Sequence, residues 1–144
     1  MPGLLLDTNA MVWFLAEAPL EDAALFAIAR AQADRTLFVS PISAWEAALA
    51  IRKTNPDRRP NLNGQDSARW FVHGRRSIGA GLVTIGHAIA LEAARVPEIY
   101  GSGDPGDCFL IATTRVKTLT IVTRDGPMAA LAAARPDYLD LIPC

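Results

Sequence analysis

The chain has 144 residues, the length of one ordinary domain, and we predict that residues 1–144 form a single unit. Hydrophobic residues make up 51% of it, which excludes a disordered chain, and two cysteines are too few for a disulfide-stapled miniprotein. No apolar run reaches the roughly 18 residues of a membrane span, and the N-terminus lacks the basic start of a secretory signal. Cys108 and Cys144 have no metal-binding or redox spacing, so we expect a reducing, cytoplasmic setting.

The net charge of −1 hides an uneven distribution along the chain. Residues 52–76 carry seven basic and two acidic side chains, a net charge of +5, whereas the segments on either side are net acidic. Such a segment is either a solvated surface or a contact for a polyanion. Arg58 and Arg59 lie in a predicted loop and are our candidates for contact with a phosphate backbone.

Hydrophobic periodicity and Gly and Pro positions predict an alternation of strands and helices. In chain order, we predict strand 4–6, helix 11–15, helix 21–33, strand 36–40, helix 42–52, helix 65–77, strand 82–85, helix 87–95 ending before Pro97, helix 107–117, strand 119–123, helix 127–134 and strand 138–142. This alternation indicates an α/β fold with a mostly parallel central sheet of four to five strands and helices on both faces.

Acidic residues stand at four junctions where a predicted strand or loop leads into a helix. They are Asp7, Glu46 (predicted in the first turn of its helix), Asp107 with Asp104 just before it, and Asp125. In open α/β sheets, ligands bind beyond the carboxyl ends of the strands. We therefore expect these four carboxylates, from four distant stretches of the chain, to converge.

Helix capping is the alternative explanation for each acid taken singly. Ser43 and Glu46 have the spacing of a capping box, and Asp104 and Asp125 precede helices that begin near a proline. Capping gives no reason to bring all the acids together, because clustered carboxylates repel one another. A divalent cation such as Mg²⁺ or Mn²⁺ would neutralise the cluster and serve phosphoryl chemistry.

Two polar residues near these acids are candidates for holding the carboxylates by hydrogen bonds. Asn9 lies two residues after Asp7, and Thr123 lies two residues before Asp125. An ordinary turn residue and an ordinary strand residue are the alternatives for these two positions.

Four segments in order resemble the PIN-domain ribonucleases, specifically the VapC-like toxins of bacterial toxin–antitoxin pairs. They are Leu4-Leu5-Leu6-Asp7-Thr8-Asn9, Val39-Ser40 through Ser43-Ala44-Trp45-Glu46, Gly103-Asp104-Pro105-Gly106-Asp107 leading into Leu110-Ile111-Ala112, and Leu119-Thr120-Ile121-Val122-Thr123-Arg124-Asp125. Together these segments span nearly the whole chain.

The resemblance implies a ribonuclease with an acidic site of Asp7, Glu46, Asp107 and Asp125 and one or two Mg²⁺ or Mn²⁺ ions. Asp7 and Asp107 would contact the metal directly, Glu46 and Asp125 would complete the site, and Asp104 is a further candidate. The resemblance also implies a small antitoxin as partner and assembly as a homodimer or a toxin–antitoxin hetero-oligomer. A non-catalytic PIN-like module that binds RNA or protein is the alternative.

Two positions beside the third acid depart from the family pattern. Cys108 stands where family members often carry arginine, and Gly106 stands where phenylalanine is common, which predicts a looser loop. The stretch Gly101 to Gly106 matches a dinucleotide-binding fingerprint by letter, but no strand precedes it, so we set that function aside. An aspartyl phosphatase is disfavoured because Asn9 replaces the usual second aspartate.

Overall fold

The computed structural model describes residues 2–144, and within that range five strands form one sheet in the order β3-β2-β1-β4-β5. Every neighbouring pair of strands is parallel, as in the pairing of Leu4 with Leu37 and with Thr120. The strands are β1 (Gly3–Leu6), β2 (Leu37–Val39), β3 (Gly81–Leu82), β4 (Leu119–Thr123) and β5 (Leu141–Pro143). The predicted α/β fold with a parallel central sheet is confirmed.

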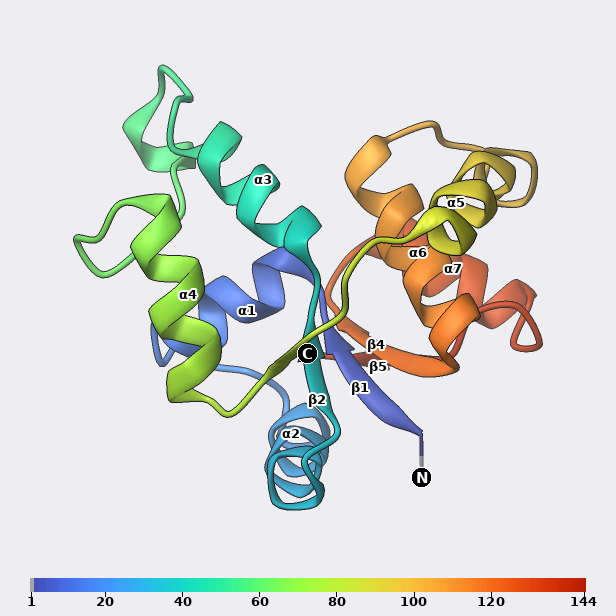
Figure 1. Ribbon diagram of the computed structural model, residues 1–144, viewed down its shortest axis with the longest axis horizontal. Coiled ribbons are helices and arrows are strands. Elements are labelled where there is room, and N and C mark those ends of the chain that lie inside the picture. Colours follow the sequence, from blue (N-terminus) through green and yellow to red (C-terminus); the bar gives the residue numbers. More distant parts are fainter. Residues whose placement is uncertain (1) are drawn as a thin grey trace.

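Helices connect successive strands and cover both faces of the sheet (Figure 1). They are α1 (Thr8–Leu15), α2 (Asp22–Asp34), α3 (Pro41–Ala50), the short 3₁₀ helix η1 (Pro56–Arg58), α4 (Ser67–Ser77), α5 (His87–Tyr100), α6 (Pro105–Lys117) and α7 (Gly126–Ala134). None of the helices in the described part of the chain has the length and apolar character needed to cross a bilayer.

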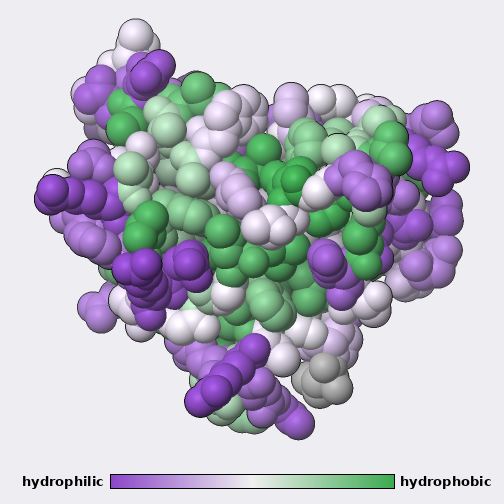
Figure 2. All heavy atoms as spheres, in the orientation of Figure 1, coloured by the Kyte–Doolittle hydropathy of each residue, from purple (hydrophilic) through white to green (hydrophobic). Residues whose placement is uncertain are grey.

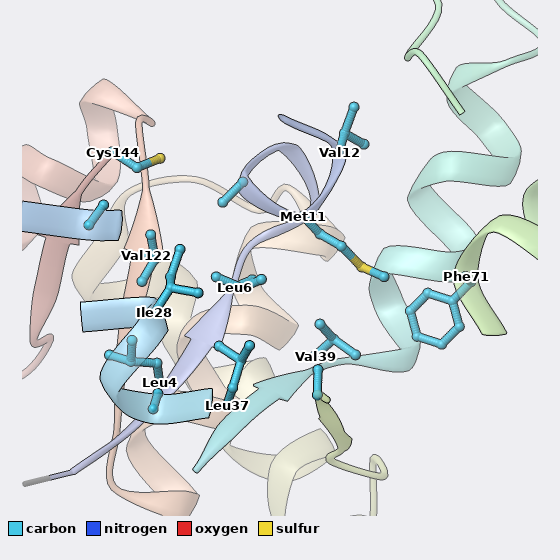
Figure 3. Packing of buried hydrophobic residues seen from close by; sticks show 14 of the residues in the cluster. Leu4, Leu6, Met11, Val12, Ile28, Leu37, Val39, Phe71, Val122 and Cys144 are labelled. Atoms are coloured by element: carbon cyan, nitrogen blue, oxygen red, sulfur yellow. The ribbon is translucent and has the colours of Figure 1, made fainter. Parts of the chain in front are cut away.

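Alternation along the strands divides the hydrophobic core between the two faces of the sheet. Leu4 and Leu6 of β1 pack with residues of α1, α2 and α4, as Figure 3 shows around Met11, Ile28 and Phe71. Leu5 points to the other face and packs with residues of α5, α6 and α7. Both faces of β1 are therefore covered, which explains why it reads as a continuous apolar run.

Helix α5 differs from its prediction, because it continues through Pro97 to Tyr100 and ends at Gly101 with a φ of 76°. A proline inside a helix removes one backbone hydrogen bond, but the packing of α5 against α6 in the second core cluster supports the extra turn. The positive φ at Gly101 ends the helix in the conformation that glycine tolerates best. This added turn brings Tyr100 to the start of α6.

Helix α3 begins at Pro41, earlier than predicted, so Glu46 lies further along its helix than we expected. Ser40 is its N-cap and accepts a hydrogen bond from the backbone N–H of Ile42, and Pro41 occupies the first helical position. Glu46 is the sixth residue of the helix and lies in its second turn, so the predicted capping box of Ser43 and Glu46 does not form. The carboxylate of Glu46 is thereby free for contacts outside its own helix.

Candidate active site

A cavity of about 190 Å³ lies at the carboxyl edge of the sheet. Because all strands are parallel, β1 and β4 end at the same edge, and Asp7 and Asp125 follow these two ends. Glu46 reaches the cavity from α3 and Asp107 reaches it from the first turn of α6. All four predicted acids line this one cavity, together with Thr8, Asn9, Trp13, Leu110 and Arg124.

Asp7 is the most deeply buried of the four acids, with 6% of its surface exposed. Its Oδ1 accepts a hydrogen bond of 2.7 Å from the backbone N–H of Ala10, and its Oδ2 accepts one from the hydroxyl of Thr123. Burial raises the pKa of Asp7 from 3.8 to about 6, while these two hydrogen bonds oppose the rise. A cation beside Asp7 would favour its charged form.

Glu46 is held in the cavity by contacts with α1 and α6. Its Oε1 accepts a hydrogen bond of 2.5 Å from the hydroxyl of Thr8, which also lies 2.9 Å from Oγ of Ser43. On its other side Glu46 lies directly against Gly106, where a Cβ atom would stand 2.3 Å from Oε2. Burial is the largest cause of a raised pKa for Glu46, and the charge of Asp107 adds to it.

Asp107 and Asp125 lie on either side of the Tyr100 hydroxyl. This hydroxyl donates to Oδ2 of Asp107 at 2.9 Å and lies 3.3 Å from Oδ2 of Asp125. Burial raises the pKa of Asp107, and the hydrogen bond from Tyr100 opposes the rise. Burial and the hydrogen bond to Asp107 also raise the pKa of Tyr100, which keeps its hydroxyl a proton donor.

Three of the predicted acids also cap helices. Asp7, Asp104 and Asp125 accept hydrogen bonds from the backbone N–H groups of Ala10, Asp107 and Met128, at 2.7, 3.1 and 2.8 Å. Capping and convergence are therefore compatible at Asp7 and Asp125, where a helix N-terminus reduces the cost of placing a negative charge. Asp104 is exposed and is not among the residues that line the cavity, so a metal role for it stays a prediction.

Thr123 and Asn9, the two residues predicted to hold carboxylates by hydrogen bonds, differ in their contacts and exposure. Thr123 contacts Asp7 through its hydroxyl, and its Oγ1 also accepts the backbone N–H of Asp125 at 3.0 Å. Asn9 is exposed and lines the cavity.

Cys108 is buried in the second core cluster with its Sγ 3.5 Å from the carbonyl oxygen of Ser102. Gly106 is buried and helical, which contradicts the looser loop that we expected there.

The donor set of the cavity fits a hard divalent cation. Carboxylate oxygens are the ligands that Mg²⁺ and Mn²⁺ prefer, and burial raises the pKa of Asp7, Glu46 and Asp107, so a bound cation would favour their charged forms. Within residues 2–144, no three His, Cys, Asp or Glu side chains form a ready-made metal group. The carboxylates instead surround the cavity and contact hydroxyl and backbone donors.

A second hollow continues from the cavity toward the basic loop. It has a volume of about 380 Å³ and shares Asn9 and Trp13 with the acidic cavity, and its far side is formed by residues 57–61, including Arg58 and Arg59. In the wall of the acidic cavity, the guanidinium of Arg124 stacks on the ring of Trp13 at 4.1 Å. Arg58 and Arg59 are exposed, and Nε of Arg59 donates to the carbonyl of Lys53 at 2.7 Å.

Sequence reasoning missed several residues at the site. Thr8 lies within the recognised Asp7-Thr8-Asn9 segment but was not predicted to hold a carboxylate. Trp13 lies in the helix that follows Asp7. The spacing of apolar residues in that helix is as consistent with a core position for Trp13 as with a position at the cavity. Tyr100 had no usable signal, because the helix that carries it was predicted to end before Pro97.

A sequence model of the PIN domain matches residues 4–134, which is most of the chain. The chain belongs to the PIN-domain family. No curated protein matches this PIN domain in sequence. The predicted family resemblance is confirmed at the level of the PIN domain.

Solved structures share the fold of this PIN domain at low sequence identity. VapBC2 from Rickettsia felis bound to a DNA fragment from its promoter has a TM-score of 0.65 at 14% identity, with 98% of each chain covered. A toxin–antitoxin complex from Klebsiella pneumoniae has a TM-score of 0.56 at 16% identity, covering 97% of this chain and 96% of the other. FitAB bound to a DNA fragment has a TM-score of 0.58 at 19% identity, covering 97% and 94%.

Proposed function

We propose that this PIN domain is a Mg²⁺- or Mn²⁺-dependent ribonuclease and acts in the cytoplasm as the toxin of a toxin–antitoxin pair. One observation carries the enzymatic part of the proposal: Asp7, Glu46, Asp107 and Asp125 come from four separate segments and line one cavity. Capping accounts for Asp7 and Asp125 but not for Glu46, which lies in the second turn of its helix. A cation site gives all four carboxylates a common role.

The roles of the four acids follow from their positions. A divalent ion held there would supply Lewis-acid chemistry, polarising the phosphodiester and activating the attacking water. Asp7 at the end of β1 and Asp107 at the start of α6 would hold the ion, as the family resemblance implies. Glu46 and Asp125 would complete the site and orient or activate the attacking water. Thr123 and Thr8 restrict the orientations of Asp7 and Glu46.

RNA is the substrate that fits the surroundings of the cavity. The hollow beyond Trp13 leads from the acids to Arg58 and Arg59, which lie in the segment with a net charge of +5. Phosphate groups of a single strand that passes through the cavity would meet this positive charge. Nε of Arg59 donates to the carbonyl of Lys53, and Arg58 is exposed beside it, where a phosphate could reach its guanidinium.

A small antitoxin is the proposed partner, since the solved structures with this fold include toxin–antitoxin complexes. Figure 2 shows hydrophobic atoms gathered in the middle of one face of the molecule. The large apolar side chains that remain exposed include Trp45 and Leu49 on α3 and Leu91 and Ile99 on α5. Exposed apolar surface of this kind supports a protein partner, whether an antitoxin or a second copy in a homodimer.

Cleavage of single-stranded RNA in the presence of Mg²⁺ tests the enzymatic part of the proposal. The wild-type protein should cut, and Asp7→Ala and Asp107→Asn should each lower the rate by at least about 100-fold, since each removes a proposed metal ligand. Glu98→Gln, an exposed acid on α5 outside the cavity, is the matched control and should cut like the wild type. Wild-type rates for both site variants would overturn the proposed roles of these acids, and no cleavage by the wild type in Mg²⁺ would favour a non-catalytic binding module.

A further inference from the structure

The hydroxyl of Tyr100 joins two acids that belong to different helices. It donates to Oδ2 of Asp107, in the first turn of α6, at 2.9 Å, and it lies 3.3 Å from Oδ2 of Asp125, the N-cap of α7. A tyrosine hydroxyl has one proton, so it donates to one carboxylate at a time. Asp107 is the nearer acceptor, and Asp125 stands within reach of the same group.

The backbone places Tyr100 at this point through one extra helical turn. Helix α5 passes Pro97 and ends with Tyr100, and Gly101 then turns the chain into the loop before α6. The tyrosine ring packs against the second core cluster, so its position is set by apolar contacts. The hydroxyl contacts the acids, and a phenylalanine would keep the ring contacts without it.

Resting on the proposed function, we propose that Tyr100 is a positioning residue for the metal ligands. Its hydroxyl holds the Asp107 carboxylate in one orientation and keeps it facing Asp125, so that an ion binds with little rearrangement of the two side chains. Hydrogen bonds to the free oxygens of ligating carboxylates have this effect in metal sites generally. Tyr100 thus acts on Asp107 as Thr123 acts on Asp7.

Mn²⁺ titration by isothermal calorimetry tests this role without an activity measurement. The full chain is stripped of metal, and the wild type is compared with Tyr100→Phe. We expect Tyr100→Phe to bind Mn²⁺ about 10- to 100-fold more weakly, the usual effect of losing such a hydrogen bond. Thermal unfolding in EDTA verifies that the variant is folded, which the retained ring contacts favour.

Tyr138→Phe is a matched control, because it removes the same atom elsewhere in the fold. The hydroxyl of Tyr138 is buried and has no hydrogen-bond partner among the described residues, and Tyr138 lines a different hollow. This variant should bind Mn²⁺ like the wild type. Equally weakened Mn²⁺ binding in the two variants would mean that the loss does not come from the contact of Tyr100 with Asp107, and that result would overturn the proposal.

The remaining outcomes separate this proposal from the proposed function. If the wild type binds Mn²⁺ and Asp107→Asn abolishes binding, but Tyr100→Phe binds with unchanged or higher affinity, Tyr100 has no positioning role and the metal site stands. Higher affinity would mean that the hydroxyl competes with the ion for Asp107. If the wild type does not bind Mn²⁺, both the positioning role and the metal dependence of the proposed function are wrong.

Discussion

The hydroxyl of Thr123, the last residue of β4, donates a hydrogen bond to Oδ2 of Asp7, which directly follows the neighbouring strand β1. The same Oγ1 atom accepts the backbone N–H of Asp125 at 3.0 Å. One buried threonine therefore connects the carboxyl ends of two paired strands and two of the four acids. Thr123 therefore couples the pairing of β1 with β4 to the positions of Asp7 and Asp125 in the cavity.

Replacing Thr123 by valine keeps the volume and removes both hydrogen bonds. We expect the free energy of unfolding to fall by about 1–3 kcal/mol, because the change leaves buried polar groups without a partner. RNA cleavage should also fall, since Asp7 loses the contact that fixes its orientation. Urea unfolding and cleavage assays measure the two effects.

The control for this change is Thr120→Val on the same strand. The hydroxyl of Thr120 is also buried but bonds to Asp140, outside the cavity. This variant should lose stability and keep its cleavage rate. Equal losses of cleavage in the two variants would mean that Thr123 acts through stability alone.

Gly106→Ala should displace Glu46 while leaving the fold intact. The added Cβ would stand 2.3 Å from Oε2 of Glu46, closer than any tolerated contact, and the flexible carboxylate would move away. We expect cleavage to fall by about 10- to 100-fold, because small displacements of catalytic groups have effects of this size. Stability in EDTA should hold or rise, since alanine favours the helix by up to about 1 kcal/mol.

Gly103→Ala is the comparison for this variant. No atom lies within 4 Å of the position that a Cβ at Gly103 would take, and its φ is not positive. It should cleave RNA at the wild-type rate. The proposed role of Glu46 would be contradicted if Gly106→Ala were as active as Gly103→Ala.

The pKa of Asp7 predicts how the stability of the metal-free protein varies with pH. Because folding raises this pKa from 3.8 to about 6, the protonated form is favoured in the folded state. The resulting stabilisation is complete below about pH 4 and is lost as the pH rises through about 6, to a total of roughly 3 kcal/mol at most. Charged Asp7 thus destabilises the metal-free protein at neutral pH.

Asp7→Asn isolates this effect, because asparagine does not titrate. In EDTA, the free energy of unfolding of Asp7→Asn relative to the wild type should increase between about pH 4 and pH 7. Urea unfolding at several pH values measures the difference, in which contributions common to both proteins cancel. A difference that stays constant or shrinks over this range would contradict the raised pKa.

The sequence was sufficient to predict β1, β2, β4 and the meeting of the acids, whereas predicted strand 82–85 is observed as Gly81–Leu82 and predicted strand 138–142 as Leu141–Pro143. Apolar runs such as Leu4-Leu5-Leu6 mark buried strands, and parallel pairing brings their carboxyl ends to one edge, so Asp7 and Asp125 could be placed near each other. Capping and clustering were treated as competing explanations of these acids. In the structure, Asp7 and Asp125 do both.

Details that depend on tertiary packing could not be predicted. A proline usually ends a helix, yet α5 continues past Pro97 because the packing of α5 against α6 offsets the lost hydrogen bond. This continuation brings Tyr100 to Asp107. Glu46 lies in the second turn of α3 and not in its first turn, because Ser40 and not Ser43 is the N-cap of this helix. The contact of Gly106 with Glu46 joins residues 60 positions apart, which no local pattern records.

Arg58→Ala tests the proposed path of the RNA strand. Arg58 is exposed at the hollow that continues from the cavity, so its removal should weaken binding of single-stranded RNA. One phosphate contact fewer should reduce the slope of log K against log salt concentration by about 0.7. Arg95→Ala, which removes an exposed charge from α5, should leave this slope unchanged. Equal slopes for Arg58→Ala and the wild type would place the strand elsewhere.

Metal add-back to the stripped wild-type protein tests most directly whether the four carboxylates form a metal-dependent nuclease centre. The cleavage rate of a labelled single-stranded RNA is measured in EDTA and then with increasing free Mn²⁺ or Mg²⁺. We predict no cleavage in EDTA and a saturable return of activity with either ion, which Asp107→Asn does not show. Undiminished cleavage in EDTA, or full activity of Asp107→Asn after add-back, would contradict the proposed metal centre.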